Sequence, residues 1–297
     1  MILEVRHRTD YRYSQRVSIS HHLLHLEPRD TAHQQLERFE LLIEPDPGFE
    51  NRSIDAFGNP TRTITLDRSH AALVIEARSQ VRLQKREVPP PLATPAWEEA
   101  ARVRLAAPDD DALEASRYAF ASPFVDLDDE IEAYARQSFL AGRPILDAAL
   151  ELNGRIFREF AFDPAATSLA TPVAEVLLTR RGVCQDFSHL MIACLRSIGL
   201  PARYQSGYLL TRPPDGKERL VGADASHAWV ALWVPCYGWV ELDPTNDCVA
   251  MQEHVTLAWG RDYGDVSPIS GSVYGGGAHD LSVAVDVVPL ATGVRPS

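Results

Sequence analysis

The chain has 297 residues, of which 45% are hydrophobic and 24% charged, and its formal net charge at pH 7 is −12. This length allows two domains with a substantial core, and the acidic balance argues against non-specific nucleic-acid binding. No apolar run approaches the roughly 20 residues of a membrane-spanning helix, and residues 1–14 lack the apolar stretch of a signal peptide. The four cysteines show no C-x-x-C spacing, so we expect a cytoplasmic protein with no disulfide framework, metal or cofactor.

The first part of the chain is predicted to form short β-strands. Period-two or β-branched runs cover Ile2–His7, Gln35–Glu44, Thr61–Leu66 and Ala72–Leu83. A turn is predicted between them at Asp55–Pro60. These runs predict a small antiparallel β-sandwich over residues 1–87. The proline-rich residues 88–95 predict a linker, and residues 96–297 a second domain.

Three histidines, His21, His22 and His25, come between the first two predicted strands. A metal site is one interpretation, but no helix places two of them on one face and no carboxylate partner is evident. We therefore favour solvated or strand-edge histidines.

Helices are predicted to dominate the next part of the chain. The acidic clusters Asp109–Asp111 and Asp128–Glu130 suit helix starts, where negative charge complements the helix dipole. Calcium binding is the weaker interpretation, because the EF-hand spacing is absent. Amphipathic patterns predict helices over Asp126–Leu140 and Ile145–Phe160, and Thr171–Pro172 predicts the start of a short helix.

The segment Arg181–His189 contains the first candidate for chemistry, Cys184. Apolar residues at spacings of three, four and seven predict a helix from Cys184 to about Ile198. Gly182 suits an αL turn between the preceding helix and this one. A cysteine in the first turn lies at the positive end of the helix dipole, which favours the reactive thiolate. Taken alone, Cys184 is equally well interpreted as a buried structural cysteine, and Cys194 is expected to be core.

Two predicted strands downstream carry a histidine and an aspartate. His227 lies in the β-branched and aromatic run Asp224–Val234, and Asp243 precedes a proline in the run Trp239–Asn246. Alone, His227 suits a structural role and Asp243 suits turn chemistry. Together with Cys184 they indicate a catalytic triad, because a thiolate needs a histidine partner, and that histidine needs a carboxylate to orient it.

The turn that joins these strands decides whether His227 and Asp243 share a face. Residues paired across antiparallel strands lie on the same face. A loop of two or four residues would put the two side chains on opposite faces. A three-residue loop with Gly238 in the αL conformation sets Asp243 opposite Trp229 and diagonal to His227. A triad therefore predicts the three-residue loop, or a bulge.

Two further strands are predicted, at Ala202–Leu210 and Leu281–Val288. The glycine-rich segment Gly271–Gly277 is predicted to be mobile.

Three blocks, Arg180–His189, Ser226–Val230 and Gly238–Asn246, resemble the core motifs of the bacterial transglutaminase-like superfamily. The resemblance covers roughly residues 165–275, and Ile2–Leu83 is similar to the β-rich domain that precedes this core in one bacterial subgroup. It implies an α+β fold: an N-terminal β-sandwich followed by a papain-like core, in which a helical lobe packs on an antiparallel sheet.

The resemblance also implies roles and chemistry. Cys184 would be the nucleophile, His227 the general base and acid, and Asp243 the residue that orients the histidine. The implied reaction is acyl transfer from a peptide or protein amide through a thioester, and hydrolysis by a peptidase or amidase is favoured. The N–H of Cys184, at the helix start, is a natural oxyanion donor. The alternative reaction is protein-glutamine acyl transfer, which crosslinks proteins.

Two other classes of function remain open. One is a binding or scaffold module with a vestigial triad, and the other is a redox protein, for which Cys194 and Cys236 would have to approach Cys184. Trp229 and Trp233 lie on the predicted face of His227 and either wall a cleft or pack the sheet.

Overall fold

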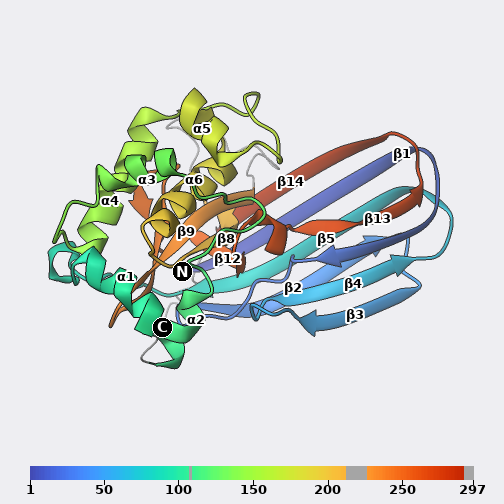
Figure 1. Cartoon of the computed structure of the whole chain (residues 1–297). Helices are drawn as coiled ribbons and strands as arrows, with labels where there is room; N and C mark the ends of the chain where they lie inside the picture. The colour runs from blue at the N-terminus through green and yellow to red at the C-terminus, as the bar shows by residue number, and fades with distance from the viewer. Residues whose placement is uncertain (107–108, 212–225, 291–297) are drawn as a thin grey trace, which may run out of the picture.

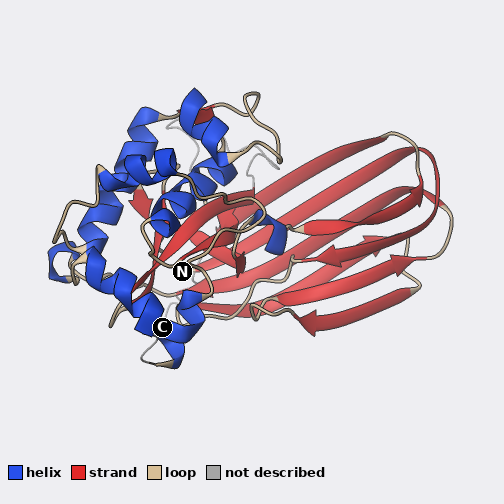
Figure 2. Cartoon of the chain, in the orientation of Figure 1, coloured by secondary structure: helices blue, strands red, loops and turns tan. Residues whose placement is uncertain are grey.

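A computed structural model shows an elongated body of antiparallel strands joined to a part in which helices cover a second, smaller sheet (Figures 1 and 2). It describes residues 1–106, 109–211 and 226–290. The strands are β1 (Ile2–Leu24), β2 (Gln34–Glu44), β3 (Phe49–Ile54), β4 (Pro60–Leu66), β5 (His70–Leu83), β6 (Ala161–Phe162), β7 (Arg181–Gly182), β8 (Ala202–Leu209), β9 (Ser226–Val234), β10 (Gly238–Asp243), β11 (Cys248–Val249), β12 (His254–Gly260), β13 (Ile269–Gly275) and β14 (His279–Leu290). The helices are α1 (Trp97–Ala106), α2 (Asp110–Ser116), α3 (Asp129–Arg136), α4 (Ile145–Glu159), α5 (Val173–Thr179) and α6 (Cys184–Ser197), with 3-10 turns at Pro91–Ala93 and Tyr263–Asp265. Across the described ranges, no helix has the length and apolar character needed to cross a bilayer.

Strand β1 organises the N-terminal sheet, because both of its edges are paired. Its first half pairs antiparallel with β5 and β14, and its second half with β4 and β13. One curled sheet thus forms two layers, β2-β5-β1-β14 and β3-β4-β1-β13. Leu24, Ile43, Ile64 and Ile75 belong to the apolar cluster that these layers share. The predicted α+β class with an N-terminal antiparallel β-domain is confirmed, in the form of this curled sheet.

Several details of this sheet differ from the prediction. Strand β1 continues far beyond Ile2–His7, because hydrogen bonds to neighbours on both sides hold its polar middle section. Strand β3, whose side chains are all exposed, was not predicted. Within the segment Gly271–Gly277, which was expected to be mobile, residues 271–275 form part of β13. A Cβ at Gly271 would lie 2.2 Å from the carbonyl oxygen of His21, so glycine permits this close pairing.

The last two strands of the described chain belong to the N-terminal sheet. The sequence division assigned residues 96–297 to one domain, but β13 and β14 hydrogen-bond to β1. Figure 1 shows β14 beside β1 along the length of the elongated body. Strands near both ends of the described chain, β1 and β14, therefore belong to one sheet.

Aspartates cap two of the helices. Asp109 accepts the Ala112 N–H at 2.8 Å at the start of α2, and Asp128 accepts the Ile131 N–H at 2.8 Å at the start of α3. The acidic clusters are thus helix starts, as predicted. Helix α3 is shorter than the predicted Asp126–Leu140, and α1 was not predicted.

Helix α6 packs on one face of the five-stranded sheet β11-β10-β9-β8-β12. Apart from Ser226, every residue of β9 is buried. Helix α6 packs on one face of this strand, and on the other face Trp229 contacts Glu241 and His254 while Trp233 packs against α2. Strand β9 is therefore held firmly from both sides.

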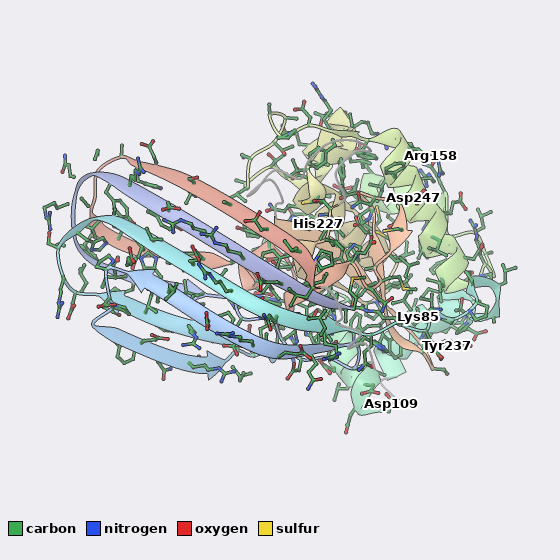
Figure 3. All side chains as sticks on the ribbon, turned by 180° about the vertical axis from the view of Figure 1, so that it is seen from behind. Lys85, Asp109, Arg158, His227, Tyr237 and Asp247 are labelled. Carbon is green, nitrogen blue, oxygen red and sulfur yellow. The ribbon has the colours of Figure 1, made fainter. Side chains whose placement is uncertain are left out.

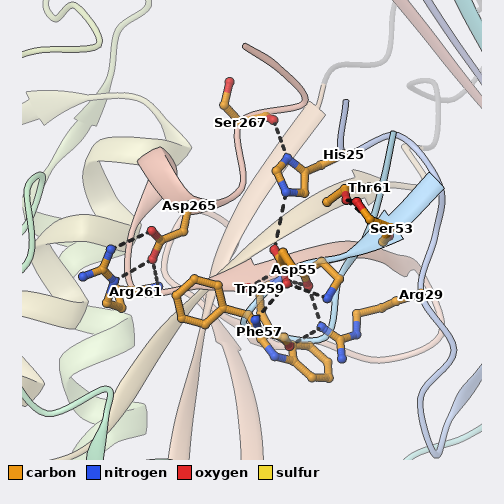
Figure 4. A network of polar contacts seen from close by, with 11 residues as sticks. His25, Arg29, Ser53, Asp55, Phe57, Thr61, Trp259, Arg261, Asp265 and Ser267 are labelled. Atoms are coloured by element: carbon orange, nitrogen blue, oxygen red, sulfur yellow. Dashed lines mark hydrogen bonds and ion pairs between the residues drawn. The ribbon is translucent and has the colours of Figure 1, made fainter. Parts of the chain in front are cut away.

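The N-terminal domain contacts the edge strand β12 through two side-chain amides. Gln34 donates to the Thr256 carbonyl at 2.7 Å and accepts the Thr256 N–H at 2.8 Å. Asn59 makes the same pair of bonds with Trp259, at 2.8 and 3.0 Å. Asp55 holds Asn59 within the predicted turn, which lies against Trp259 in Figure 4. These amides replace a neighbouring strand at the sheet edge.

The three N-terminal histidines do not converge on a common ligand position. His21 contacts Thr65 at 2.8 Å, and His25 contacts the Ser267 carbonyl at 3.0 Å and Asp55 at 3.5 Å (Figure 4). The carboxylate partner of His25 was not evident from sequence because it lies 30 residues away. In the structure, His25 contributes to the contact between the domains.

Candidate active site

The start of α6 is built by a short loop that a buried carboxylate holds in place. Val183 is the N-cap residue, and Asp186 accepts its N–H at 2.8 Å and the Thr167 hydroxyl at 2.7 Å. A Cβ at Gly182 would lie 2.8 Å from the Cβ of Asp186, so glycine allows the close approach. The αL turn predicted at Gly182 lies instead at Arg180, which has φ 55°.

Cys184 is the first residue of α6 and is partly exposed. The N–H groups of a helix's first turn have no acceptor within the helix, and their positive potential favours an anion nearby. The nucleophile candidate therefore lies where a thiolate and an oxyanion are both favoured.

The hairpin between β9 and β10 has the register that a triad requires. Val234 pairs with Gly238 and Val230 pairs with Leu242, so the connecting loop has three residues. Gly238 has φ 79°, as predicted for its αL position. The predicted register is confirmed, and it places Asp243 and His227 on one face of the sheet.

The structure brings Cys184, His227 and Asp243 together. His227 Nε2 donates to Asp243 Oδ2 at 2.7 Å, and the imidazole also forms a hydrogen bond with the Cys184 side chain. Since Nε2 is engaged, Nδ1 is the ring nitrogen left for the sulfur. Burial alone would lower the pKa of His227, but the bonds to Asp243 and Cys184 outweigh it and raise this pKa to about 10. The imidazole therefore favours its cationic form at neutral pH.

The Asp243 carboxylate is fully buried and heavily hydrogen-bonded. Its Oδ1 accepts the N–H groups of Thr245 and Asn246 at 2.9 and 3.2 Å. Its Oδ2 accepts Asn246 Nδ2 at 2.7 Å and His254 Nε2 at 3.1 Å, in addition to His227. Burial would raise the pKa of Asp243, but these bonds hold it far below its usual range. Asp243 is thus a fixed anion.

Sequence reasoning missed His254. This residue begins β12, a strand that was not predicted, although the β-branched and apolar residues after it are a usable strand signal. His254 is 4% exposed and reaches Asp243 because β12 and β10 belong to one sheet.

His227, Asp243 and His254 also offer three ligand atoms within 4.8 Å of one another. Their spacing is accounted for by hydrogen bonds of 2.7 and 3.1 Å from the two imidazoles to one carboxylate oxygen. We therefore assign this cluster to hydrogen bonding rather than to a metal.

The two tryptophans on the face of His227 are buried packing residues. Trp229 is fully buried, stacks on His227 at 6.0 Å between ring centres, and donates its indole N–H to Glu241 at 2.7 Å. Trp233 packs in a cluster with Ala112 and Ala115 of α2. Of the two, Trp229 also helps to hold the imidazole in place.

The other three cysteines have different surroundings. Burial raises the pKa values of the Cys194 and Cys248 thiols to about 12. Cys236 is exposed in the hairpin loop, and all four thiols are free. Cys184 combines partial exposure, a helix start and a histidine partner.

Two family models match this chain. Residues 3–82 match the bacterial transglutaminase-like N-terminal region, and residues 132–244 match the transglutaminase-like superfamily. An uncharacterised protein of Mycobacterium tuberculosis is 39% identical over 296 residues, which cover 96% of this chain and 92% of that protein.

Two better described proteins match as well. The protein-glutamine gamma-glutamyltransferase of Pseudomonas aeruginosa is 37% identical over 105 residues, which cover 32% of this chain and 15% of that enzyme. A solved structure from Cytophaga hutchinsonii, described as a candidate cysteine protease, matches 100% of this chain and 93% of its own with a TM-score of 0.78 at 19% identity, and so has the same fold. The chain belongs to the transglutaminase-like superfamily and carries its bacterial N-terminal region.

Proposed function

We propose that this protein is a cysteine hydrolase that cleaves peptide or carboxamide bonds through a thioester on Cys184. The observation that carries the proposal is the hydrogen-bonded series from the Cys184 side chain through His227 to the buried Asp243. The bonds to Cys184 and Asp243 favour an imidazolium, which is the acid that an amide leaving group needs.

The reaction has two steps. The Cys184 thiolate attacks the carbonyl carbon, and the C–N bond breaks as the His227 imidazolium gives its proton to the departing amine. His227, now neutral, then takes a proton from water as the hydroxyl attacks the thioester. This releases the carboxylic acid and restores the thiolate and the imidazolium. Asp243 keeps the ring oriented throughout and stabilises its cationic form.

The oxyanion of each tetrahedral intermediate needs N–H or O–H donors. The first is the backbone N–H of Cys184 at the start of α6. For the second we propose the hydroxyl of Tyr204, a buried residue of β8. Burial raises the pKa of Tyr204 well above its usual value, and the nearby Cys184 sulfur raises it further, so the phenol stays protonated beside the thiol.

Transamidation is the second candidate reaction. It is favoured by the similarity to the Pseudomonas aeruginosa protein-glutamine gamma-glutamyltransferase. The two reactions differ in what resolves the thioester. Incubating a glutamine-containing peptide with the protein and a primary amine, with mass spectrometry of the product, distinguishes the acid (hydrolysis) from the substituted amide (transfer).

The first test is the pH dependence of Cys184 alkylation by iodoacetamide. The background is Cys236→Ser, because the exposed Cys236 would otherwise react as well. We expect Cys184 to be modified well below pH 8, more slowly in the His227→Ala variant and not at all in Cys184→Ala. Reaction only above pH 8, with no effect of His227→Ala, would indicate a vestigial triad and a binding or scaffold role.

We also propose that the protein acts in the cytoplasm. Its four thiols are free, which suits a reducing compartment.

A further inference from the structure

A cavity of about 540 Å³ lies between the linker and the core sheet. Its walls are formed by residues 31–33, by residues 86–90, and by residues from four strands of the sheet, β8, β10, β11 and β12. These strand residues include Arg203 of β8, Trp239 and Glu241 of β10, and Trp259 of β12. The cavity is thus built jointly by the N-terminal region and the core.

The cavity lies on the face of the sheet that carries Asp243, but at a distance from it. Alternate residues of a strand share a face, so Trp239, Glu241 and Asp243 follow one another along β10. At roughly 3.3 Å per residue, the wall residues Glu241 and Trp239 lie about 7 Å and 13 Å from Asp243 along the strand. Figure 3 shows Tyr237, which also lines the cavity, well away from His227. Cys184, His227 and Asp243 are not among the residues that line the cavity, so the cavity is separate from the triad.

Arg203 is a buried cation in the wall of this cavity. It is 4% exposed, and its guanidinium carbon lies 4.2 Å from the ring centre of Trp239 and 3.7 Å from that of Trp259. Two aromatic rings therefore hold the guanidinium by cation–π contact.

No carboxylate of the described chain lies within ion-pair distance of Arg203, and its buried Nε has no hydrogen-bond partner there. The nearby Glu241 is already engaged, because it pairs with Arg86 and accepts the Trp229 indole N–H. Buried charges in proteins are ordinarily paired. Burial lowers the pKa of Arg203 only to about 10, so the group remains cationic at neutral pH.

The chemistry of the walls indicates what would pair with this cation. A guanidinium presents a planar fork of N–H donors that matches a carboxylate. Apolar and aromatic side chains such as Val88, Val249 and Trp239 make up much of the remaining surface. We propose that the cavity binds a carboxylate carried on an apolar or aromatic body, with Arg203 as its anchor. The site does not depend on Cys184, and its occupancy is separate from the proposed hydrolysis.

The test compares ligands that differ only in charge. N-acetylphenylalanine carries the carboxylate, N-acetylphenylalaninamide is its neutral counterpart, and a tetrapeptide ending in phenylalanine presents the carboxylate as a peptide terminus. Binding to the full chain is measured by isothermal titration calorimetry and by the NMR signals of the tryptophan indoles. Trp97, outside the cavity lining, is the internal reference for Trp239 and Trp259.

The matched variants are Arg203→Met and Arg136→Met. Arg136 also lies over a tryptophan, at 5.7 Å from the Trp97 ring centre, but it is exposed and paired with Glu132. We expect the free acid to bind at least tenfold more tightly than the amide. Arg203→Met should weaken acid binding at least tenfold, whereas Arg136→Met and Cys184→Ala should leave it unchanged.

Three results would overturn the proposal: equal affinity for acid and amide, acid binding unaffected by a folded Arg203→Met variant, or no binding of either ligand. If Arg203→Met does not fold, the wild-type comparison still decides. In that case the proposal requires that the free acid, and not the amide, shifts the indole signals of Trp239 and Trp259 while the signal of Trp97 stays unchanged. Tighter binding of the tetrapeptide than of the free amino acid would identify a peptide terminus as the ligand, and the reverse a small molecule.

Discussion

The Nε2 atom of His254 lies 3.1 Å from Oδ2 of Asp243, the oxygen that also accepts the hydrogen bond of the candidate catalytic imidazole. The two imidazoles thus share one anionic oxygen. His254 is buried and packs edge-on against Trp229, with 5.2 Å between ring centres. In the described chain its Nδ1 has no hydrogen-bond partner. Asp243 is therefore the one polar contact of this imidazole in the described chain, and we assign His254 a positioning role.

This relationship predicts the effects of two substitutions. His254→Phe removes a hydrogen bond to a charged group, worth about 1.5–3 kcal/mol, so kcat/KM should fall roughly 10- to 100-fold. His254→Gln keeps an N–H donor, so its kcat/KM should stay close to that of the wild type. The fall should appear in kcat rather than in KM. Equal loss in both variants would mean that His254 only supports the fold.

The pKa of His227 predicts the alkaline limb of the pH profile. Leaving-group protonation needs the imidazolium, and the bonds to Asp243 and Cys184 raise its pKa to about 10. Activity should therefore persist above pH 7 and fall as the pH rises through about 10. In Asp243→Asn the limb should move toward lower pH, because the carboxylate no longer favours the cation. Circular dichroism across the same range would show whether unfolding causes the decline; a wild-type limb near pH 6.5 would contradict the prediction.

The loop before Cys184 predicts a strong effect of one methyl group. Gly182→Ala would force a Cβ to within 2.8 Å of Asp186 and disturb the bond from Val183 N–H. We expect a loss of about 1–3 kcal/mol in the free energy of unfolding, together with slower alkylation of Cys184. Urea unfolding and alkylation rates measure the two effects.

Gly154→Ala is the control for this substitution. In α4 an added Cβ meets only the ends of the Arg158 and Asp247 side chains, which can move away. Its stability should be equal to or above that of the wild type, because alanine favours the helix. Similar losses in both variants would argue against a special role for the Gly182 contact.

The proposed oxyanion role of Tyr204 predicts a specific kinetic signature. Removing one oxyanion donor in other enzymes costs about 10²- to 10³-fold in kcat. Tyr204→Phe should produce a loss of this order with little change in KM. Alkylation of Cys184 by iodoacetamide, which forms no oxyanion, should be nearly unchanged. Parallel losses in hydrolysis and alkylation would instead mean that the hydroxyl acts on the thiol.

The parts of the site that depend on local sequence could be predicted. The helix that begins at Cys184 follows from the spacing of its apolar residues. The register that brings Asp243 beside His227 follows from a three-residue loop with a glycine in the αL conformation. Both rest on short-range geometry, which the chain encodes within about 20 residues.

The parts that depend on distant pairing could not be predicted. His254 joins Asp243 only once β12 has paired with β8. The second half of β1 is held by partners more than 200 residues away, in β13. The alternation of hydrophobic and polar residues in this half of β1 is too weak to predict a strand from sequence alone. Arg203 resembles any arginine of a strand until two tryptophans from other strands enclose it.

The side-chain amides of Gln34 and Asn59 complete the edge of β12, so the core depends on the N-terminal region for this part of its sheet. A fragment that begins after the linker would present an open strand to any other chain with a free edge. It would also carry β13 and β14 without the strand on which they assemble. The region that carries the triad is therefore not expected to fold independently of the N-terminal region. Swapping it between relatives, or expressing it alone, should yield aggregates unless the N-terminal region accompanies it.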